Sequence, residues 1–367
     1  MKSQSTTGNL QIIDVIKNHP KKEICIQDVA DIEYIALETT DDVLLSDNVV
    51  LSCISDNYIL LHEPVLGNIF LFHRTGKIAA HFNHKGQSGW EYALIGRAGT
   101  IFDEKKGEIF VCSQYIQVYS MNGEHKRTLK INTIRNETKV FNFDDESLLV
   151  VDGVNIDPYF KGDPKTNPYS LVSKKDGSLT AILNISLPKR YSNKIAQPSG
   201  NGWRPVEIFY PNSMFYGRDF IIADISCDTM FLLTQNKQLA PILTREPSVH
   251  SSDPRKIWTT LLNTDRFIVM GIIPLVFNSR GGKIPFLIYE FDTGQTSEIS
   301  FLDVEYNRRK WSLDSSPAIA KNMYAELMQV PPLLEAYKKK QLSGEFEKFV
   351  ETLDEDDNPI VRIMKFK

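Results

Sequence analysis

A short hairpin pattern recurs five times along the chain, and this repeat constrains the fold more than any other feature of the sequence. Each copy has two short, largely apolar runs around a tight turn. The turn positions are Gly76, Gly123, Gly177, Lys237 and Gly294, so successive copies lie about 50 to 60 residues apart. Asn-Gly and Asp-Gly turns need positive φ, which glycine adopts without strain. The pattern therefore predicts a β-hairpin at each of these positions.

A second pair of apolar runs precedes each hairpin, with a polar break between the two runs. In the first copy the pair covers residues 49–63, and in the second copy it covers residues 99–113. Each copy therefore amounts to four short antiparallel strands in about 50 residues, which is the size of one propeller blade. A blade cannot bury both of its faces alone, so several blades have to pack around an axis.

The two ends of the chain carry strands that belong to none of the five copies. Residues 358–367 form one such strand, and residues 23–38 contain one or two more. A sixth blade built from both ends would leave no open edge. We therefore expect an all-β fold, a single six-bladed β-propeller over residues 23–367 that both termini close. Residues 1–22 are polar at their start and are expected to form a tether ahead of it.

The segment from about residue 316 to residue 353 departs from the β pattern and shows helical spacing instead. The apolar residues that share one helical face are Phe346, Phe349, Val350 and Leu353. Ser343 is suited to the N-cap position, and Pro331 with Pro332 is expected to break the segment into at least two helices. We expect a helical insertion in the last blade.

Composition excludes several classes of protein. Hydrophobic residues make up 42% and charged residues 24%, which is ordinary for a soluble globular chain. The net charge of −4 leaves no basic footprint, so we expect no nucleic-acid partner. No apolar stretch is long enough for a transmembrane segment. The four cysteines form no CxxC pair, and we expect them to be buried free thiols.

Catalytic motifs are missing from the sequence. There is no nucleophile elbow, no Walker loop and no dinucleotide fingerprint. His81 and His84 are three residues apart near a strand end, where their side chains point to opposite faces. His62 and His250 do not match each other in blade position, and the acidic run 354–357 lacks EF-hand spacing. We expect no catalytic residue, no metal and no cofactor; a metal-dependent propeller lyase or hydrolase is the alternative.

Three longer connections are candidates for binding: residues 85–92, 151–170 and 191–212. Long loops in a compact domain are functional or disordered, and aromatic residues give contact area at a small cost in rotamer entropy. The candidate ligand-binding residues are Trp90, Glu91, Tyr92, Tyr159, Trp203 and Arg204. Trp90 and Trp203 would act as aromatic platforms, with Glu91 and Arg204 as polar partners. Alternatively, these aromatic residues fill gaps between blades.

Three stretches carry a resemblance to a known family. Residues 32–47 (IEYIALETTDDVLLSD) are similar to an entry motif "IPLETT", residues 81–92 (HFNHKGQSGWEY) to a first-blade exit "GxGPGEY", and residues 354–367 to a closing strand "DNPVL". The chain thus resembles the six-bladed β-propellers of gut Bacteroidales, related in layout to NHL-repeat and TolB-like propellers. Ser88 and Trp90 depart from the glycine-rich motif of that exit.

The resemblance implies an exported protein of the outer membrane or periplasm, of the lipoprotein type. A lipid anchor in front of the polar start would fit this expectation. It also implies a non-catalytic binding or scaffold role more than an enzyme, with a glycan, a peptide or an envelope protein as the partner. An intracellular protein-interaction propeller is the other alternative.

Overall fold

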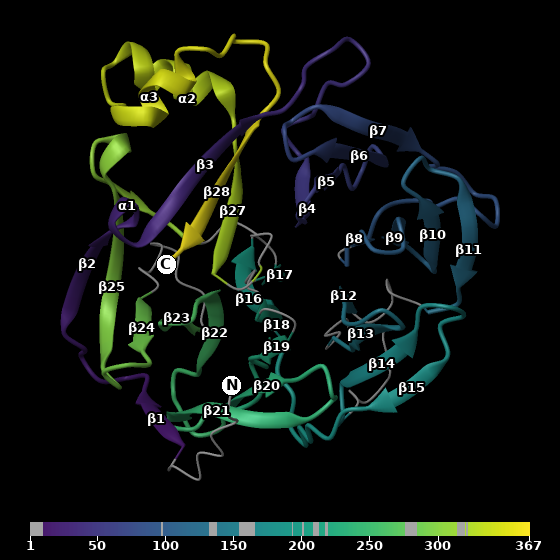
Figure 1. Ribbon diagram of the computed structural model, residues 1–367. Coiled ribbons are helices and arrows are strands. Elements are labelled where there is room, and N and C mark those ends of the chain that lie inside the picture. The colour runs from purple at the N-terminus through teal and green to yellow at the C-terminus, as the bar shows by residue number, and fades with distance from the viewer. Residues whose placement is uncertain are drawn as a thin grey trace. The chain divides into compact units, whose positions relative to one another are not determined.

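The computed structural model of the chain separates into two compact units. Residues 1–23 with 193–300 form the small unit, and residues 24–192 with 301–367 form the large unit. The described residues are 10–96, 98–131, 138–153, 166–192, 194–199, 202–207, 213–216, 219–275, 285–313, 320 and 322–367. The strands form the sheets of a six-bladed β-propeller arrangement, which confirms the predicted fold (Figure 1).

Three sheets of the large unit have the predicted blade layout of four antiparallel strands in chain order. The first contains β4 (Val50–Ile54), β5 (Tyr58–His62), β6 (Asn68–His73) and β7 (Ile78–Asn83). The second contains β8 (Thr100–Asp103), β9 (Glu108–Cys112), β10 (Ile116–Ser120) and β11 (His125–Leu129). The third contains β12 (Lys139–Asn142), β13 (Ser147–Val151), β14 (Tyr169–Ser173) and β15 (Leu179–Ile182).

Apolar side chains between neighbouring sheets form the core of the large unit. Leu60 and Leu71 of the first sheet pack in one cluster with Ile109 and Val111 of the second, and all four are at most 1% exposed. Strands buried on both faces need no strict alternation of apolar and polar residues, which explains continuous runs such as Ile109–Cys112.

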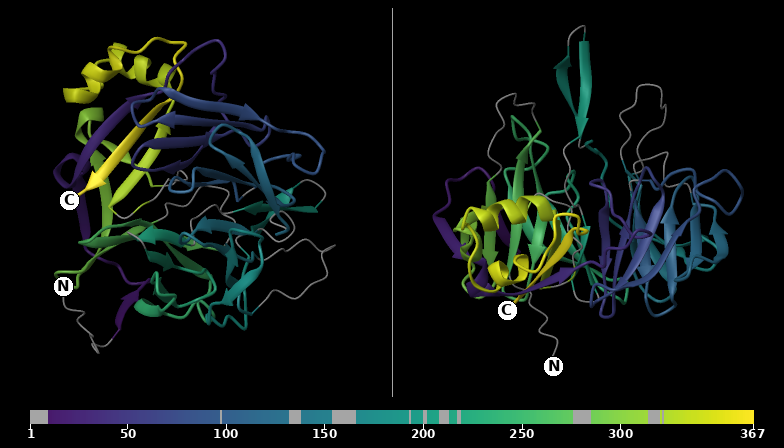
Figure 2. Two further views of the ribbon diagram at one scale, coloured as in Figure 1. Left: turned by 45° about the vertical axis from the view of Figure 1, so that its right-hand side comes forward. Right: turned by 90° about the horizontal axis from the view of Figure 1, so that it is seen from above.

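The small unit contains two further blades and a separate hairpin. One sheet contains β18 (Ser213–Tyr216), β19 (Asp219–Ile222), β20 (Thr229–Leu233) and β21 (Leu239–Glu246). The other contains β22 (Lys256–Asn263), β23 (Phe267–Pro274), β24 (Phe286–Glu290) and most of β25 (Thr296–Asp303). The last three residues of β25 belong to the large unit, where they pair with β26 (Arg309–Trp311). The hairpin of β16 (Lys194–Ser199) and β17 (Gly202–Glu207) projects from this unit (teal in Figure 2, right).

The N-terminal segment differs from the tether that we expected over residues 1–22. β1 (Gln11–Asp14) pairs in parallel with β21, and β2 (Lys21–Cys25) extends the sheet of β25. The N–H of Glu298 donates to the carbonyl of Pro20 at 2.8 Å, which fixes the link between the two strands. The segment therefore covers sheet edges whose N–H and C=O groups would otherwise lack partners.

The sixth sheet takes strands from both ends of the chain, as predicted. β28 (Ile360–Phe366) lies between β27 (Met323–Met328) and β3 (Ala30–Ala36) and is antiparallel to both. Figure 1 shows the purple β3 beside the yellow β28.

The helical segment is shorter than the predicted range of residues 316–353. Residues 323–328 form β27, and the helices are α2 (Val330–Lys338) and α3 (Gly344–Val350). Pro331 and Pro332 occupy the first turn of α2, where a missing N–H costs nothing, so they begin this helix instead of breaking it. Phe346 of α3 stacks on Tyr34 of β3 with ring centroids 4.5 Å apart. The described residues contain two further short helices, α1 (Ile26–Val29) and η1 (Val304–Tyr306).

All five predicted turn positions have positive φ, which confirms the repeat as it was found in the sequence. The φ values are +85° at Gly76, +84° at Gly123, +79° at Gly177, +62° at Lys237 and +67° at Gly294. Gly76 is also required by packing, because a Cβ atom there would lie 1.9 Å from the carbonyl oxygen of Ala36 in β3. Lys237 shows that a residue with a side chain can also adopt positive φ at this turn position.

Candidate functional site

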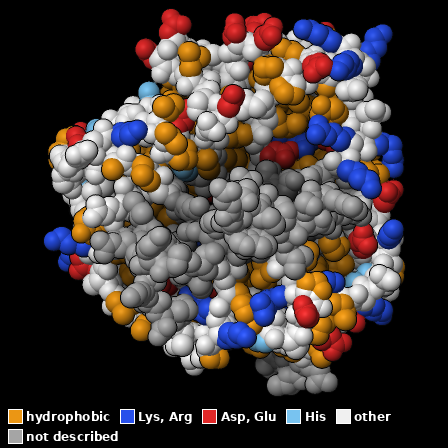
Figure 3. Space-filling view, turned by 180° about the vertical axis from the view of Figure 1, so that it is seen from behind, with side chains coloured by type: hydrophobic (Ala, Val, Ile, Leu, Met, Phe, Trp, Pro, Cys, Tyr) orange, Lys and Arg blue, Asp and Glu red, His pale blue; other side chains and the backbone are white. Residues whose placement is uncertain are grey.

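The candidate site lies on the connection between β7 and β8 in the large unit. In an antiparallel blade, connections of the β5–β6 and β7–β8 kind emerge at one end of the sheets, and the tight turns emerge at the other. The predicted binding residues Trp90, Glu91 and Tyr92 all lie on this connection. Figure 3 shows this end of the molecule, where hydrophobic side chains gather at the upper left beside the grey residues.

Tyr92 anchors the connection from inside. Its side chain is 1% exposed, and its hydroxyl donates to the carbonyl of Gly67 at 2.7 Å and accepts from the N–H of His84 at 3.0 Å. Burial raises the pKa of Tyr92 to about 12, so the phenol stays protonated and keeps its donor. Tyr92 therefore supports the loop and does not face a ligand.

Glu91 is held by its own loop. Its carboxylate accepts from the backbone N–H of Ser88 at 2.8 Å, and this hydrogen bond lowers the pKa of Glu91. The carboxylate lies directly over Gly86, where a Cβ atom would come within 1.9 Å of it. The geometry thus explains why glycine stands at position 86, and it turns the carboxylate toward the loop.

Trp90 is partly exposed and is supported by the aromatic rings of Tyr119 and His84. The hydroxyl of Tyr119 in β10 donates to the carbonyl of Trp90 at 2.6 Å, and the His84 ring stacks on Tyr119 with centroids 5.2 Å apart. The indole meets the edge of the His84 ring at 5.2 Å and remains 44% exposed. The loop is also tied to β10 because Gln117 donates to the carbonyl of Gly89 at 3.2 Å. The backbone that carries the indole is therefore held in place before any ligand arrives.

Four more large apolar side chains are exposed at the same end of these sheets. Val65 is 71% exposed, Leu66 52%, Leu94 44% and Tyr115 39%. Val65 and Leu66 lie between β5 and β6, Leu94 follows the Trp90 loop, and Tyr115 lies between β9 and β10. We call Val65, Leu66, Trp90, Leu94 and Tyr115 the loop platform.

Hydrogen bonds join the loops that carry the platform. The Lys85 ammonium donates to the carbonyl of Val65 at 2.7 Å, and the Asn83 amide donates to the carbonyl of Leu66 at 3.0 Å. The N–H of Ile95 donates to Pro64 at 3.2 Å. Because these bonds order the backbone in advance, little conformational entropy remains to be lost when a partner binds.

The other three predicted site residues are not part of this platform. Trp203 and Arg204 lie on β17 in the small unit, where Trp203 is opposite Pro198 of β16. Tyr159 lies outside the described residues, as do residues 154–165 of the second predicted loop. Sequence reasoning missed Val65 and Leu66, although two adjacent apolar residues before Gly67 in a short connection were a usable signal.

The histidines offer no catalytic arrangement in the part of the chain that the structure describes. His62 is 3% exposed, and its Nδ1 lies 2.6 Å from the Ser52 hydroxyl. Burial lowers the pKa of His62 to about 4. The His81 ring stacks on Phe70 with ring centroids 4.4 Å apart, whereas the His84 ring stacks on Tyr119. Among the described residues, no three His, Cys, Asp or Glu side chains are grouped so as to hold a metal ion.

Two further observations bear on the sequence predictions. Cys112 is buried, whereas Cys25, Cys53 and Cys227 are partly buried, and all four are free thiols. Searched over its described residues, the chain has no helix with the length and hydropathy to cross a membrane.

Comparison with known proteins shows a family and a fold. The profile of a family described as a domain of unknown function (DUF4934) matches residues 10–365. A protein of Bacteroides fragilis described as exported has 11% sequence identity and a TM-score of 0.62, and the match covers 95% of this chain and 99% of that one. Among curated proteins, none matches this chain.

Two other solved structures are more distant. A member of the DUF4221 family from Bacteroides vulgatus has 11% identity and a TM-score of 0.48, covering 93% of this chain and 99% of that one. A virginiamycin B lyase from Staphylococcus aureus has 11% identity and a TM-score of 0.36, covering 73% and 88%. At these scores neither likeness bears on function, and the match to the Bacteroides fragilis protein bears on the fold alone.

Proposed function

This chain belongs to the DUF4934 family, and we propose that it is a non-catalytic binding propeller of the bacterial cell envelope whose loop platform docks a protein partner. The observation that carries the proposal is the platform itself. Five large apolar side chains, between 39% and 71% exposed, are presented by connections that hydrogen bonds hold in place. Exposed apolar patches of this kind on soluble proteins mark interaction surfaces.

The chemistry of the platform favours an apolar protein surface or peptide over a glycan. Val65, Leu66 and Leu94 are aliphatic and offer no hydrogen bond to a sugar hydroxyl. The charged residues of segment 85–96 are Lys85 and Glu91, and both bond to the backbone of these loops. A partner would therefore meet aliphatic and aromatic surface with Trp90 as its anchor, and aromatic anchors dominate protein interfaces.

The envelope location rests on two supports. The sequence resembles exported propellers of the NHL and TolB-like type, and the Bacteroides fragilis protein with the same fold is described as exported. We place the chain in the periplasm or on the outer membrane, with a lipid anchor on the full-length protein. Fractionation of cells that express the native gene should recover the protein with the envelope. Recovery in the cytosol would instead support an intracellular interaction propeller.

A binding experiment tests the platform. A random peptide library displayed on phage is selected against the purified chain, and the best peptide is titrated by calorimetry against Trp90→Ala and Leu66→Ser. We expect each substitution to weaken binding by about 1–3 kcal/mol, which is the range of an interface anchor. Thermal stability should change little, because both side chains are substantially exposed in the unbound chain.

The chain supplies a matched control. Leu179 of β15 is 59% exposed and lies outside the platform, so Leu179→Ser removes a similar apolar surface elsewhere in the large unit. Its affinity for the peptide should equal that of the wild type. The proposal is wrong if the selected peptides bind Trp90→Ala as tightly as the wild type, or if a glycan array gives platform-dependent binding and the peptides do not. Platform-dependent dimerisation in sedimentation analysis would assign the surface to a second copy of the chain and also contradict it.

A further inference from the structure

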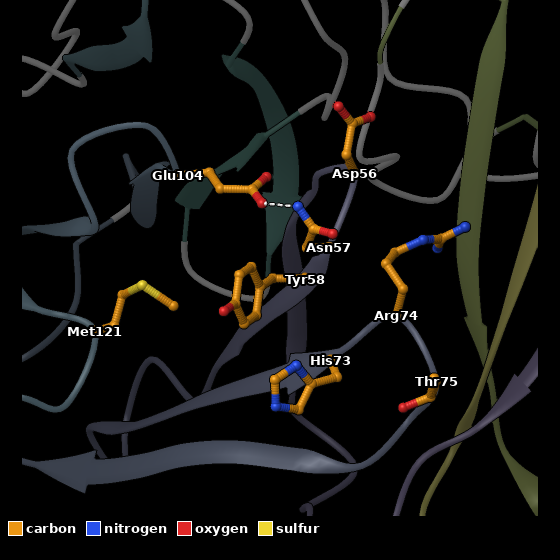
Figure 4. A pocket seen from close by; sticks show the side chains of 8 residues that line it. All are labelled: Asp56, Asn57, Tyr58, His73, Arg74, Thr75, Glu104 and Met121. Atoms are coloured by element: carbon orange, nitrogen blue, oxygen red, sulfur yellow. Dashed lines mark hydrogen bonds between the residues drawn. The ribbon is translucent and has the colours of Figure 1, made fainter.

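A second candidate site lies at the opposite end of the large unit's sheets, where the tight turns emerge. Turns β4–β5 and β6–β7 of the first sheet and turns β8–β9 and β10–β11 of the second surround a hollow of about 540 Å³ (Figure 4). Its lining comprises Asp56, Asn57, Tyr58, His73, Arg74, Thr75, Glu104 and Met121. This site uses none of the platform residues, so the inference is independent of the proposed function.

The repeat explains why the hollow is open. The first residue after the third strand of a blade is Arg74 in the first sheet and Lys174 in the third, and each forms an ion pair with the sheet before it. Arg74 bonds to Glu33 of β3 at 2.8 Å, and Lys174 bonds to Asp103 of β8 at 2.6 Å. The equivalent residue of the second sheet is Met121, which carries no charge. The first and third sheets therefore carry a cation at this repeat position, and the second sheet, which borders the hollow, carries none there.

The lining carries two carboxylates without a described basic partner. Arg74 of the lining pairs with Glu33, which is shared with Lys365, and the second terminal nitrogen of Arg74 is buried without a hydrogen-bond partner. The two carboxylates of the lining, Asp56 and Glu104, outnumber this one cation. Glu104 accepts a neutral hydrogen bond from the Asn57 amide at 2.6 Å, which leaves its charge uncompensated. Neither Asp56 nor Glu104 forms an ion pair with a cation of the described residues. The hollow is thus net acidic and rich in acceptor atoms.

Aromatic rings supply the second part of the site. Tyr58 is fixed by an edge contact to Phe102 at 5.8 Å and by the tilted ring of His73 at 5.2 Å. Figure 4 shows the Glu104 carboxylate above the Tyr58 ring, with the Met121 side chain beside it. A carboxylate next to an aromatic face stabilises a cation by charge and by the ring quadrupole together.

From this arrangement we propose that the hollow binds the guanidinium or ammonium group of a basic peptide side chain. Asp56 and Glu104 accept its hydrogen bonds, and Tyr58 packs against its flat face or its alkyl stem. An anionic ligand would be repelled by both carboxylates. The bound side chain would occupy the place that Arg74 and Lys174 fill at the neighbouring positions of the repeat.

The probe is the blocked tripeptide N-acetyl-glycyl-arginyl-glycinamide, titrated into the full chain and followed by NMR shifts. Its citrulline counterpart has nearly the same shape but no charge and serves as the matched ligand. We expect the arginine peptide to bind at least about tenfold more tightly than the citrulline peptide, which corresponds to about 1.4 kcal/mol. Binding should weaken as salt is added, because the charges of the hollow are exposed to solvent.

Substitutions locate the binding in the hollow. Glu104→Gln and Asp56→Asn should each weaken the arginine peptide severalfold, whereas Asp47→Asn should not. Asp47 is an exposed carboxylate that precedes β4, whereas Asp56 follows β4 at the other end of the strand. Asp47→Asn therefore controls for the loss of one negative charge outside the hollow. Met121→Lys places a cation of the chain's own at the hollow and should abolish binding. Met121→Leu keeps the shape and should retain it.

Each outcome decides the question. Failure of the arginine peptide to bind the folded chain would overturn the proposal. So would equal binding of the citrulline peptide, or binding that Met121→Lys leaves intact. Circular dichroism of every variant separates a lost site from a lost fold.

Discussion

A chain that stops at Asp357 is expected to lose the cooperative folding of the large unit. The truncation removes β28, which hydrogen-bonds to β27 on one side and β3 on the other. Four of its side chains are fully buried: Ile360, Val361, Ile363 and Met364. Each contributes about 1.5–3 kcal/mol of hydrophobic stabilisation, and the net stability of a domain is only about 5–15 kcal/mol.

Asn358, two residues before this strand, is also removed by the truncation. Asn358 is 4% exposed, and its amide donates to the carbonyls of Glu38 and Val43 at 2.8 Å each. Its side-chain oxygen accepts from the N–H of Leu45 at 2.9 Å. These bonds fix the connection from β3 to β4, so the truncation also releases the start of the first blade.

Far-UV circular dichroism and thermal unfolding of the two lengths measure the effect. The control is a chain that stops at Phe366, which loses Lys367, its exposed ion pair with Asp31 at 2.7 Å and the hydrogen bond from its N–H to the carbonyl of Val29 at 2.9 Å. The ion pair and the hydrogen bond are each worth about 1 kcal/mol, so the control should unfold much closer to the wild type than the chain that stops at Asp357. A truncated chain that still unfolds cooperatively near the wild-type temperature would show that β28 is dispensable.

The sequence located the repeat because the turn chemistry is local. A tight hairpin turn needs positive φ at one or both of its central residues, which favours glycine there. Gly76, Gly123 and Gly177 were therefore visible without any tertiary information. The closing strands at both ends were also visible, since an apolar run outside any repeat needs a partner. The shared sheet of β27, β28 and β3 confirms this reasoning.

The edge strands were less predictable because their pairing depends on partners far away in the chain. β1 is four residues long, with Ile13 buried at 1% and Ile12 51% exposed, and such a short run resembles a polar linker. Its position is set by β21, more than 200 residues later. Likewise, Met323–Met328 forms a strand because β28 lies beside it, although the neighbouring segment has helical spacing.

The candidate site was predictable in part. Trp90 was found because it is an aromatic residue on a long, glycine-rich connection, and the structure places it on the surface at 44% exposure. The support from Tyr119 and His84 depends on how the second sheet packs, which no local pattern reports. The acidic hollow was hidden for the same reason. It depends on the contrast between Met121 and the cations at the equivalent repeat positions, whose acidic partners lie in other sheets.

The second large effect is expected at Arg362, at the centre of β28. This side chain is 3% exposed and forms ion pairs with Asp303 of β25 and Glu326 of β27, the latter through its Nε at 2.7 Å. Burial opposes the charged form, but the two carboxylates outweigh it and hold the pKa of Arg362 above its ordinary value. Asp303 is also 3% exposed, so its carboxylate could not regain water if the guanidinium were removed, whereas the Glu326 side chain is 13% exposed.

Arg362→Ala should therefore lower the free energy of unfolding by about 3–5 kcal/mol, which is the cost of leaving buried charges without a partner. Denaturant unfolding monitored by tryptophan fluorescence measures it. Lys365→Ala is the matched control, because Lys365 lies on the same strand and pairs with Glu33 at 3.1 Å while 57% exposed. An exposed pair contributes about 0–1 kcal/mol, so this variant should remain close to the wild type. If both substitutions lowered the free energy of unfolding equally, burial of the Arg362 ion pairs would not determine how much they contribute to stability. The expected difference arises because Arg362 balances the buried charge of Asp303, whereas Lys365 pairs with the more exposed Glu33.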